Sequence, residues 1–133
     1  MIIDTSAIIA VLRREPETDE FLHAMSSAGC RMSVGSYLEA AIVADSVGSP
    51  ALSRYFDDLV DAAALQLEPM TLEQAQVARQ AYRDYGRGSG HPAGLNFGDC
   101  FAYALARTTR EPLLFKGDDF NHTDVLPAVG PSR

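Results

Sequence analysis

The chain opens with three hydrophobic residues, positions 1–3, that stop at a carboxylate, Asp4. Three residues are too few for a helix, so this run predicts a short buried strand. Residues 5–13 follow with hydrophobic positions at helical spacing and predict a helix. A second helix is expected over residues 16–28, because a proline at position 16 suits a first helical turn and Gly29 suits a helix end. The chain therefore begins as strand, helix, helix.

The same alternation of short strands and helices continues to the end of the chain. Hydrophobic runs predict further strands at residues 31–34, 65–67, 112–115 and 124–126. Amphipathic spacing predicts helices that open at Ser36, over residues 52–63, from Thr71 to about residue 85, and from Asn96 to about residue 110. This order predicts an α/β fold with a short parallel sheet of four to five strands, covered by helices on both faces. Residues 1–133 are expected to form a single domain, with 127–133 as a frayed tail.

Composition narrows the class of protein. No stretch reaches the roughly 18 consecutive hydrophobic residues that a membrane helix needs, and the start lacks the positive charge of a secretory signal. The two cysteines, Cys30 and Cys100, are far apart and lack metal-binding spacing, which predicts a reducing, cytoplasmic compartment. Taken alone, a net charge of −7 argues against a nucleic-acid binder, because phosphate contacts usually come from Lys and Arg. However, ten of the eleven cationic residues are Arg, whose guanidinium suits phosphate.

Acidic residues fall where strands give way to helices, which is where parallel sheets bind ligands. These residues are Asp4, Glu39, Asp99 and the pair Asp118/Asp119. Taken singly, each has an ordinary structural explanation. Asp4 suits a helix cap, Glu39 and Asp99 each stand three residues after a capping residue, and the Asp pair suits a turn.

Taken together, the same acids suggest a metal site. Helix starts crowd along one edge of a parallel sheet, so these carboxylates become neighbours and repel one another. A cation relieves that repulsion, and oxygen-only ligands suit Mg²⁺ or Mn²⁺. The three histidines, at positions 23, 91 and 122, are scattered, which argues against zinc.

Four short motifs, in this order, resemble those of PIN-domain nucleases, most closely the VapC-like toxins of mycobacterial type. They are IDTSA at positions 3–7, YLE at 37–39, GDCFA at 98–102 and LLFKGDDF at 113–120. The resemblance spans nearly the whole chain. It implies a PIN-like α/β fold, Mg²⁺-dependent cleavage of RNA, a homodimer and a cognate small antitoxin protein.

The resemblance also assigns roles to individual residues. It makes Asp4 and Asp99 the principal metal ligands and Glu39 a third acid of the site. Many PIN domains have the fourth acid where this chain has Gly117, so the fourth role falls to Asp118 or Asp119, with Asp118 preferred. Ser6 corresponds to a hydroxyl that orients the site.

Metal chemistry suits such a reaction without the family name. Hydrolysis of a phosphodiester needs an activated water, neutralised charge at phosphorus and a stabilised leaving oxygen, all of which bound Mg²⁺ supplies. One metal or two would serve, and the sequence leaves that open. No Ser-His-Asp or Cys-His pattern offers a competing mechanism.

Cationic residues near the expected site are candidates for RNA contact. Arg13 and Arg14 follow the first helix, and Arg87 and His91 lie in the glycine-rich segment at residues 86–95. That segment predicts a surface loop rather than a phosphate-binding loop, because it follows a helix and not a strand.

Two other functions are compatible with the pattern. An aspartyl-nucleophile phosphatase also has an Asp at a strand end, but it requires Asp-x-Asp, and Asp4 is followed by Thr5 and Ser6. A catalytically silent binding module would use the acids only as caps. Metal titration separates the silent module from the enzymes, and the substrate cleaved separates the enzymes from each other.

Overall fold

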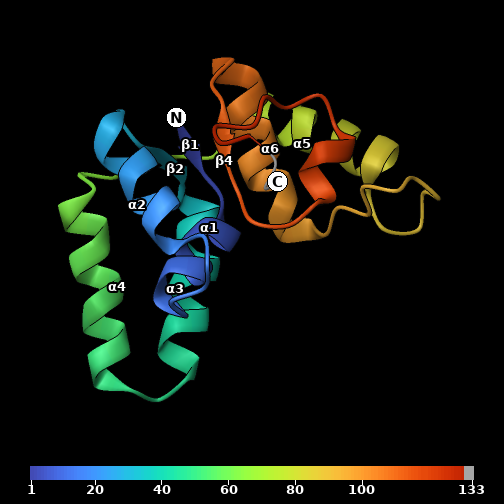
Figure 1. The fold of residues 1–133 in the computed structure, drawn as a ribbon. Helices are drawn as coiled ribbons and strands as arrows, with labels where there is room; N and C mark the ends of the chain where they lie inside the picture. Colours follow the sequence, from blue (N-terminus) through green and yellow to red (C-terminus); the bar gives the residue numbers. More distant parts are fainter. Residues whose placement is uncertain (131–133) are drawn as a thin grey trace.

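Four parallel strands form the centre of the computed structural model, which describes residues 1–130 (Figure 1). In the order in which they lie side by side, the strands are β3 (Gln66–Glu68), β2 (Arg31–Ser33), β1 (Ile2–Ile3) and β4 (Leu113–Leu114). All three pairings are parallel. The carboxyl ends of the strands therefore meet at one edge, as the sequence predicts.

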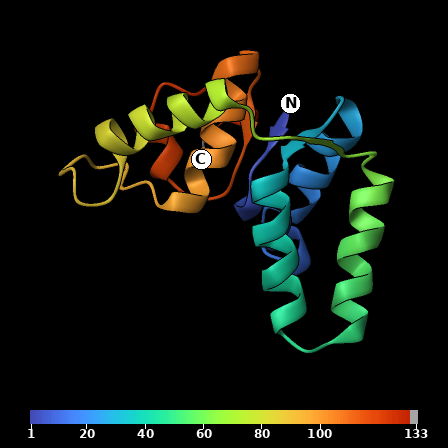
Figure 2. The same ribbon diagram turned by 180° about the vertical axis from the view of Figure 1, so that it is seen from behind.

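Helices cover both faces of this sheet, which confirms the predicted α/β fold. They are α1 (Thr5–Leu12), α2 (Thr18–Ser27), α3 (Val34–Ser46), α4 (Pro50–Ala62), α5 (Leu72–Tyr85) and α6 (Phe97–Thr109). The first four lie on one side and α5 and α6 on the other, and α3 and α4 form an antiparallel pair that extends beyond the sheet (Figures 1 and 2). Within residues 1–130, no helix combines the length and hydrophobicity needed to span a membrane.

Successive strand residues point to opposite faces and give the molecule two main cores. Ile3 and Leu114 join the core formed with α1–α4, whereas Ile2 and Leu113 join the core under α6. Each of these four side chains is fully buried. Two-residue strands suffice for β1 and β4 because the sheet is sandwiched, so both residues of each strand have a core to enter.

The start of α3 differs from the prediction. The helix begins at Val34, and the Ser33 hydroxyl caps it by accepting the Gly35 N–H at 3.2 Å. Ser36, the predicted capping residue, is fully buried inside the helix. Glu39 is therefore not part of a capping box, and its placement needs another explanation.

The C-terminal segment also differs from the prediction. The strand expected at 124–126 is absent from the described sheet, and Pro127 instead forms an isolated parallel bridge with Leu113. The Ala128 N–H donates to the Leu113 carbonyl at 2.8 Å, and Ala128 and Val129 pack against the core. Residues 127–129 of the predicted tail make these contacts, and residues 131–133 of it lie outside the described part.

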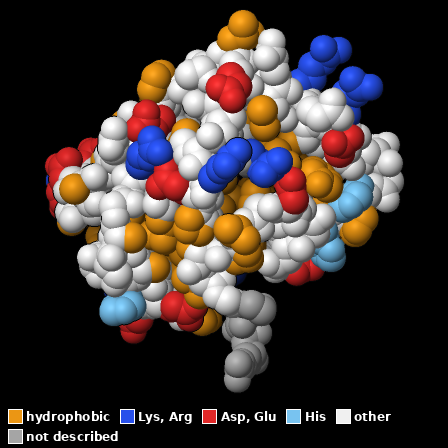
Figure 3. All heavy atoms as spheres, turned by 90° about the horizontal axis from the view of Figure 1, so that it is seen from above, with side chains coloured by type: hydrophobic (Ala, Val, Ile, Leu, Met, Phe, Trp, Pro, Cys, Tyr) orange, Lys and Arg blue, Asp and Glu red, His pale blue; other side chains and the backbone are white. Residues whose placement is uncertain are grey.

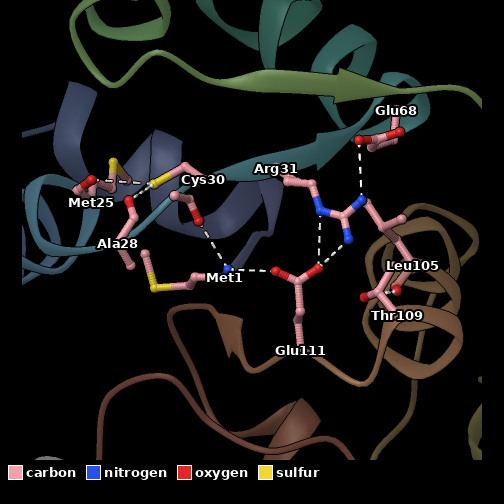
Figure 4. A network of polar contacts seen from close by, with 10 residues as sticks. Met1, Met25, Ala28, Cys30, Arg31, Glu68, Leu105, Thr109 and Glu111 are labelled. Atoms are coloured by element: carbon pink, nitrogen blue, oxygen red, sulfur yellow. Dashed lines mark hydrogen bonds and ion pairs between the residues drawn. The ribbon is translucent and has the colours of Figure 1, made fainter.

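A polar network ties the strands together on the side away from their carboxyl ends (Figure 4). Glu111 accepts the α-amine of Met1 at 2.8 Å and the Arg31 Nε at 3.0 Å, and Arg31 Nη1 also reaches Glu68 at 3.2 Å. Partial burial disfavours ionisation of Glu111, but these hydrogen bonds outweigh it and hold its pKa below the usual value. The network joins β1, β2 and β3 to the segment before β4.

Candidate metal centre at the carboxyl edge of the sheet

Asp4 lies at the carboxyl end of β1 and begins α1. Its backbone N–H donates to Leu114 at 3.0 Å, and its Oδ2 caps the helix by accepting the Ser6 N–H at 3.0 Å. Its other oxygen, Oδ1, is buried without a hydrogen-bond partner. Burial, followed by the charges of Asp99 and Glu39, raises the pKa of Asp4 to about 7 against the lowering effect of Ser6. An unpartnered buried oxygen at this position is available to a cation.

Asp99 occupies the first turn of α6 in the capping box that the sequence predicts. Its Oδ2 accepts the Asn96 N–H at 3.0 Å, while its own N–H donates to Asn96 Oδ1 at 2.8 Å. Burial raises the pKa of Asp99, with smaller contributions from the negative charges of Asp119 and Glu39. Capping thus fixes the carboxylate without excluding a functional role for it.

Glu39 reaches the site because two glycines allow α3 and α6 to pack closely. A Cβ at Gly98 would lie 2.8 Å from both Cδ and Oε1 of Glu39, so only glycine leaves room for that carboxylate. A Cβ at Gly35 would lie 2.6 Å from the ring of Phe101. The sequence analysis did not recognise this role of the glycines, although their positions beside YLE and GDC were the available signal.

The three carboxylates line one pocket together with two cationic side chains, one further acid and an amide. Asp4, Glu39 and Asp99 share this pocket with Asn96, Arg13, Glu15 and Lys116. Lys116, the only lysine of the chain, forms ion pairs with Glu15 and, at 3.2 Å, with Glu17. The sequence analysis missed both Lys116 and Glu15. The signal available for Lys116 was its position immediately after the last strand.

Neither Asp118 nor Asp119, the two candidates for the fourth acid, lines the pocket of the other three carboxylates. Asp118 does not line the pocket of the other acids, and its highly exposed carboxylate pairs instead with Asn121 at 3.1 Å and His122 at 2.7 Å. Those hydrogen bonds lower the pKa of Asp118. Asp119 instead lies near enough to contribute to the raised pKa of Asp99. The electrostatic effect on Asp99 favours Asp119, whereas the pocket lining favours neither residue, so the fourth acid stays a prediction.

Two hydroxyl groups hold the start of α1 in place. The Ser6 Oγ accepts the Lys116 N–H at 3.0 Å, and the buried Thr5 hydroxyl donates to the Ser36 carbonyl at 3.0 Å. The first bond joins α1 to the end of β4, and the second joins it to α3. Ser6 therefore lies where a residue that orients Asp4 would be expected.

The predicted cationic contacts occupy different surroundings. Arg13 is exposed at the rim of the acidic pocket, whereas Arg14 lines a separate pocket beside Tyr55. In the loop at residues 86–95, the charge of Arg87 acts against the raised pKa of Asp99. His91 has a structural role, because its Nδ1 accepts the Ala93 N–H at 3.1 Å. On the face at the top of Figure 1, cationic side chains are interspersed with acidic ones (Figure 3).

The donor set fits a hard divalent cation. The pocket offers carboxylate oxygens, one of them buried and unpartnered, together with the side chain of Asn96. Within residues 1–130, no group of three or more His, Cys, Asp and Glu side chains is arranged so that it could hold a metal ion by itself. Mg²⁺ commonly binds through only one or two carboxylates and completes its shell with water and phosphate.

Comparison with known proteins decides the family. The sequence profile of the PIN domain matches residues 1–126. The chain belongs to the PIN-domain family. This PIN domain is 55% identical to ribonuclease VapC28 of Mycobacterium tuberculosis over 130 residues, which cover 97% of this chain and 98% of the relative. It is 50% identical to ribonuclease VapC42 of the same species, with coverage of 96% and 98%.

Solved structures agree on the fold of this PIN domain. VapC20 of Mycobacterium tuberculosis, a Sarcin-Ricin loop cleaving toxin, superposes with a TM-score of 0.70 at 15% identity, covering 98% of both chains. A toxin–antitoxin complex from Klebsiella pneumoniae gives a TM-score of 0.70 at 14% identity, covering 96% of this chain and 97% of the other. At such low identity, these likenesses establish the architecture alone.

Proposed function

We propose that this PIN domain is a metal-dependent endoribonuclease that acts as the toxin of a toxin–antitoxin pair. The observation that carries the proposal is the pocket at the carboxyl edge of the sheet that Asp4, Glu39 and Asp99 line from three separate elements. Relatives of 50–55% identity over nearly the whole chain are named VapC ribonucleases. The specific cation proposed is Mg²⁺, with Mn²⁺ as an equivalent.

The residues of the pocket have different roles in the proposed reaction. Asp4 and Asp99 are the principal metal ligands, with Glu39 as a third acid. Asp119, rather than Asp118, is the better candidate for a fourth. When bound, the cation would lower the pKa of a water and offset the charge of the phosphate. The chain holds Asp4 with Ser6 and Asp99 with Asn96, so both carboxylates are oriented before substrate arrives.

Loss of a ligand tests the mechanism. Asp4→Ala and Asp99→Ala should each reduce Mg²⁺-dependent RNA cleavage by several orders of magnitude, because electrostatic stabilisation is usually the largest catalytic contribution. Asp61→Asn, at an exposed position of α4, is the matched control. Circular dichroism must show that each variant is folded, and EDTA gives the background. A folded Asp99→Ala protein that cleaves RNA at the wild-type rate would refute the proposed mechanism.

The competing functions predict different results. A silent binding module, with its acids acting only as caps, would lose about 1 kcal/mol of stability on mutation and show no cleavage at all. A phosphatase would hydrolyse small phosphate esters rather than RNA. Asp4 is followed by Thr5 and Ser6, and the backbone N–H of Ser6 already contacts its carboxylate. The second Asp of the phosphatase pattern is therefore missing at the place where that reaction needs it.

An antitoxin partner is part of the proposal, because a toxin in a growing cell needs neutralising. A small protein that places an Arg or Lys among the carboxylates would occupy the position of the cation. Co-expression with the product of the neighbouring small open reading frame tests this. If that product neither binds this chain nor relieves growth arrest, the antitoxin part of the proposal is refuted and the nuclease part is unaffected.

A homodimer is also proposed, and α3 offers the surface. Val34, Leu38 and Ile42 recur at helical spacing with 40%, 58% and 58% exposure. Phe97 of α6, which is 76% exposed, packs on Phe101 of the same helix. The ring of Phe101 in turn covers Gly35 of α3. Leu38→Glu should shift the mass measured by light scattering from dimer to monomer, and Leu126→Glu, at a 65% exposed control position, should not. A monomeric wild type would rule out the homodimer.

We also propose a cytoplasmic location. Cys30 and Cys100 are both unpaired and buried, which supports a reducing compartment.

A further inference from the structure

The backbone of Lys116 is linked through Ser6 to Asp4, the most buried carboxylate of the pocket. Its N–H donates to Ser6 Oγ at 3.0 Å, and the N–H of Ser6 donates to Asp4 Oδ2 at 3.0 Å. Two hydrogen bonds therefore fix the Lys116 backbone relative to Asp4. A four-carbon side chain on a fixed backbone can change direction while its origin stays at the pocket.

The ammonium of Lys116 lies at the boundary between two pockets. Lys116 lines the acidic pocket with Asp4 and Asp99, and it also lines a neighbouring pocket with Phe21, Phe115 and Asn121. A single-stranded RNA that passes from one pocket to the next would carry a phosphate past this position. The carboxylates of the acidic pocket would hold the metal at the reacting phosphate, and Lys116 is placed to contact the next phosphate along the strand.

The present partners of Lys116 are suited to release it. Glu15 and Glu17 lie on the connection between α1 and α2, and the paired side chains are partly exposed, at 36% for Lys116, 25% for Glu15 and 32% for Glu17, although the Oε2 atom of Glu17 is buried. Ion pairs with this much access to water contribute little to stability. Exchange of a carboxylate partner for a phosphate oxygen therefore costs the fold little.

We propose that Lys116 is a positioning residue that leaves Glu15 and Glu17 to contact an RNA phosphate adjacent to the one being cleaved. The two glutamates hold the ammonium at the rim in the free protein and compete with RNA for it. This inference rests on the proposed ribonuclease function and adds a residue for substrate binding. If the ion pairs of Lys116 with Glu15 and Glu17 were purely structural, their removal should change stability and leave RNA binding unchanged.

Removal of the charge provides the first test. Lys116→Met keeps the length of the side chain, Lys116→Arg keeps the charge, and Arg79→Met removes one charge from an exposed position on α5 as the matched control. RNA binding is measured by fluorescence anisotropy with labelled single-stranded RNA in EDTA, where metal-dependent cleavage does not occur. Each phosphate contact on a single strand adds about 0.7 to the slope of log K for RNA binding against log salt. At 0.1 M salt, loss of one such contact corresponds to a roughly fivefold lower affinity.

Lys116→Met should therefore weaken RNA binding about fivefold and reduce the slope of log K against log salt by about 0.7. Lys116→Arg and Arg79→Met should keep a salt slope close to that of the wild type. In cleavage assays with Mg²⁺, the loss should appear mainly in KM, with kcat and the Mg²⁺ concentration for half-maximal rate unchanged. An unchanged salt slope and KM in folded Lys116→Met would overturn the proposal.

The double variant Glu15→Gln/Glu17→Gln provides the second test and does not require Lys116→Met to fold. It should strengthen RNA binding by releasing Lys116, and the gain should disappear when Lys116→Met is added. Asp57→Asn/Asp58→Asn, exposed on α4, controls for the change in net charge. If the glutamates merely fix the connection, the double variant should instead melt earlier and bind RNA no better than this control.

The two proposals fail separately. A wild type that binds RNA with a Lys116-dependent salt slope but never cleaves it would refute the ribonuclease and retain the positioning role. Cleavage that requires Asp99 and is indifferent to Lys116 would do the reverse.

Discussion

The buried carboxyl of Asp4 should make the metal-free protein less stable as pH rises. Its pKa is about 7 in the folded protein, against an ordinary value of 3.8, because of burial and then the neighbouring Asp99 and Glu39 charges. A carboxyl with a raised folded-state pKa stabilises the fold while it is protonated. That stability is complete below about pH 4 and is lost as pH rises through about 7.

The difference between 3.8 and about 7 sets the size of the effect. At 1.36 kcal/mol for each pH unit, it amounts to about 4 kcal/mol. A domain of this size is stable by only 5–15 kcal/mol, so such a loss is large. Asp4→Asn removes the titration and keeps an oxygen that can accept the Ser6 N–H, and Asn caps helices as well as Asp does.

Urea denaturation in EDTA at several pH values between 4.5 and 7.5 measures the effect. The free energy of unfolding of Asp4→Asn should exceed that of the wild type by about 1 kcal/mol at pH 4.5 and by about 4 kcal/mol at pH 7.5. Added Mg²⁺ should recover part of the wild-type stability at pH 7.5 by linkage, about 2.7 kcal/mol at a hundred times its dissociation constant. Asp61→Asn serves as the control. Parallel curves for Asp4→Asn and wild type across this pH range would refute the reasoning.

Three further predictions test particular positions. Gly98→Ala should displace the Glu39 carboxylate, because the new Cβ would lie 2.8 Å from its Oε1, and RNA cleavage should fall at least tenfold in a folded protein. Asp119→Asn should reduce the cleavage rate far more than Asp118→Asn, since only Asp119 contributes to the raised pKa of Asp99; equal losses would contradict this assignment. Glu111→Gln should lower the free energy of unfolding by about 1 kcal/mol at pH 7 and by less near pH 4, because its pKa is depressed in the fold. Cleavage should be unaffected, since Glu111 lies in the network away from the pocket, and a change in kcat would show otherwise.

Local sequence was enough to predict the order of the elements and the positions of three acids. Hydrophobic runs located all four strands, and the caps at Asp4, Thr71 and Asn96 were each recognisable from neighbouring residues. Covalent geometry explains this success, because the spacing of residues along one helix or strand fixes which side chains share a face. Parallel pairing then brings the strand ends to one edge, whatever the details of packing.

Distances between elements that are remote in sequence were decided only by the tertiary structure. The Glu39 carboxylate reaches Asp99 because Gly98 and Gly35 let α3 and α6 approach, a contact that no periodicity encodes. The fourth acid depends on the turn after β4, where Gly117 has a φ of +99° and Asp118 turns toward His122. Lys116 enters the pocket through a hydrogen bond to Ser6, 110 positions away. Such contacts arise from the simultaneous close packing of many side chains, so they belong to the folded molecule and to no single segment of the chain.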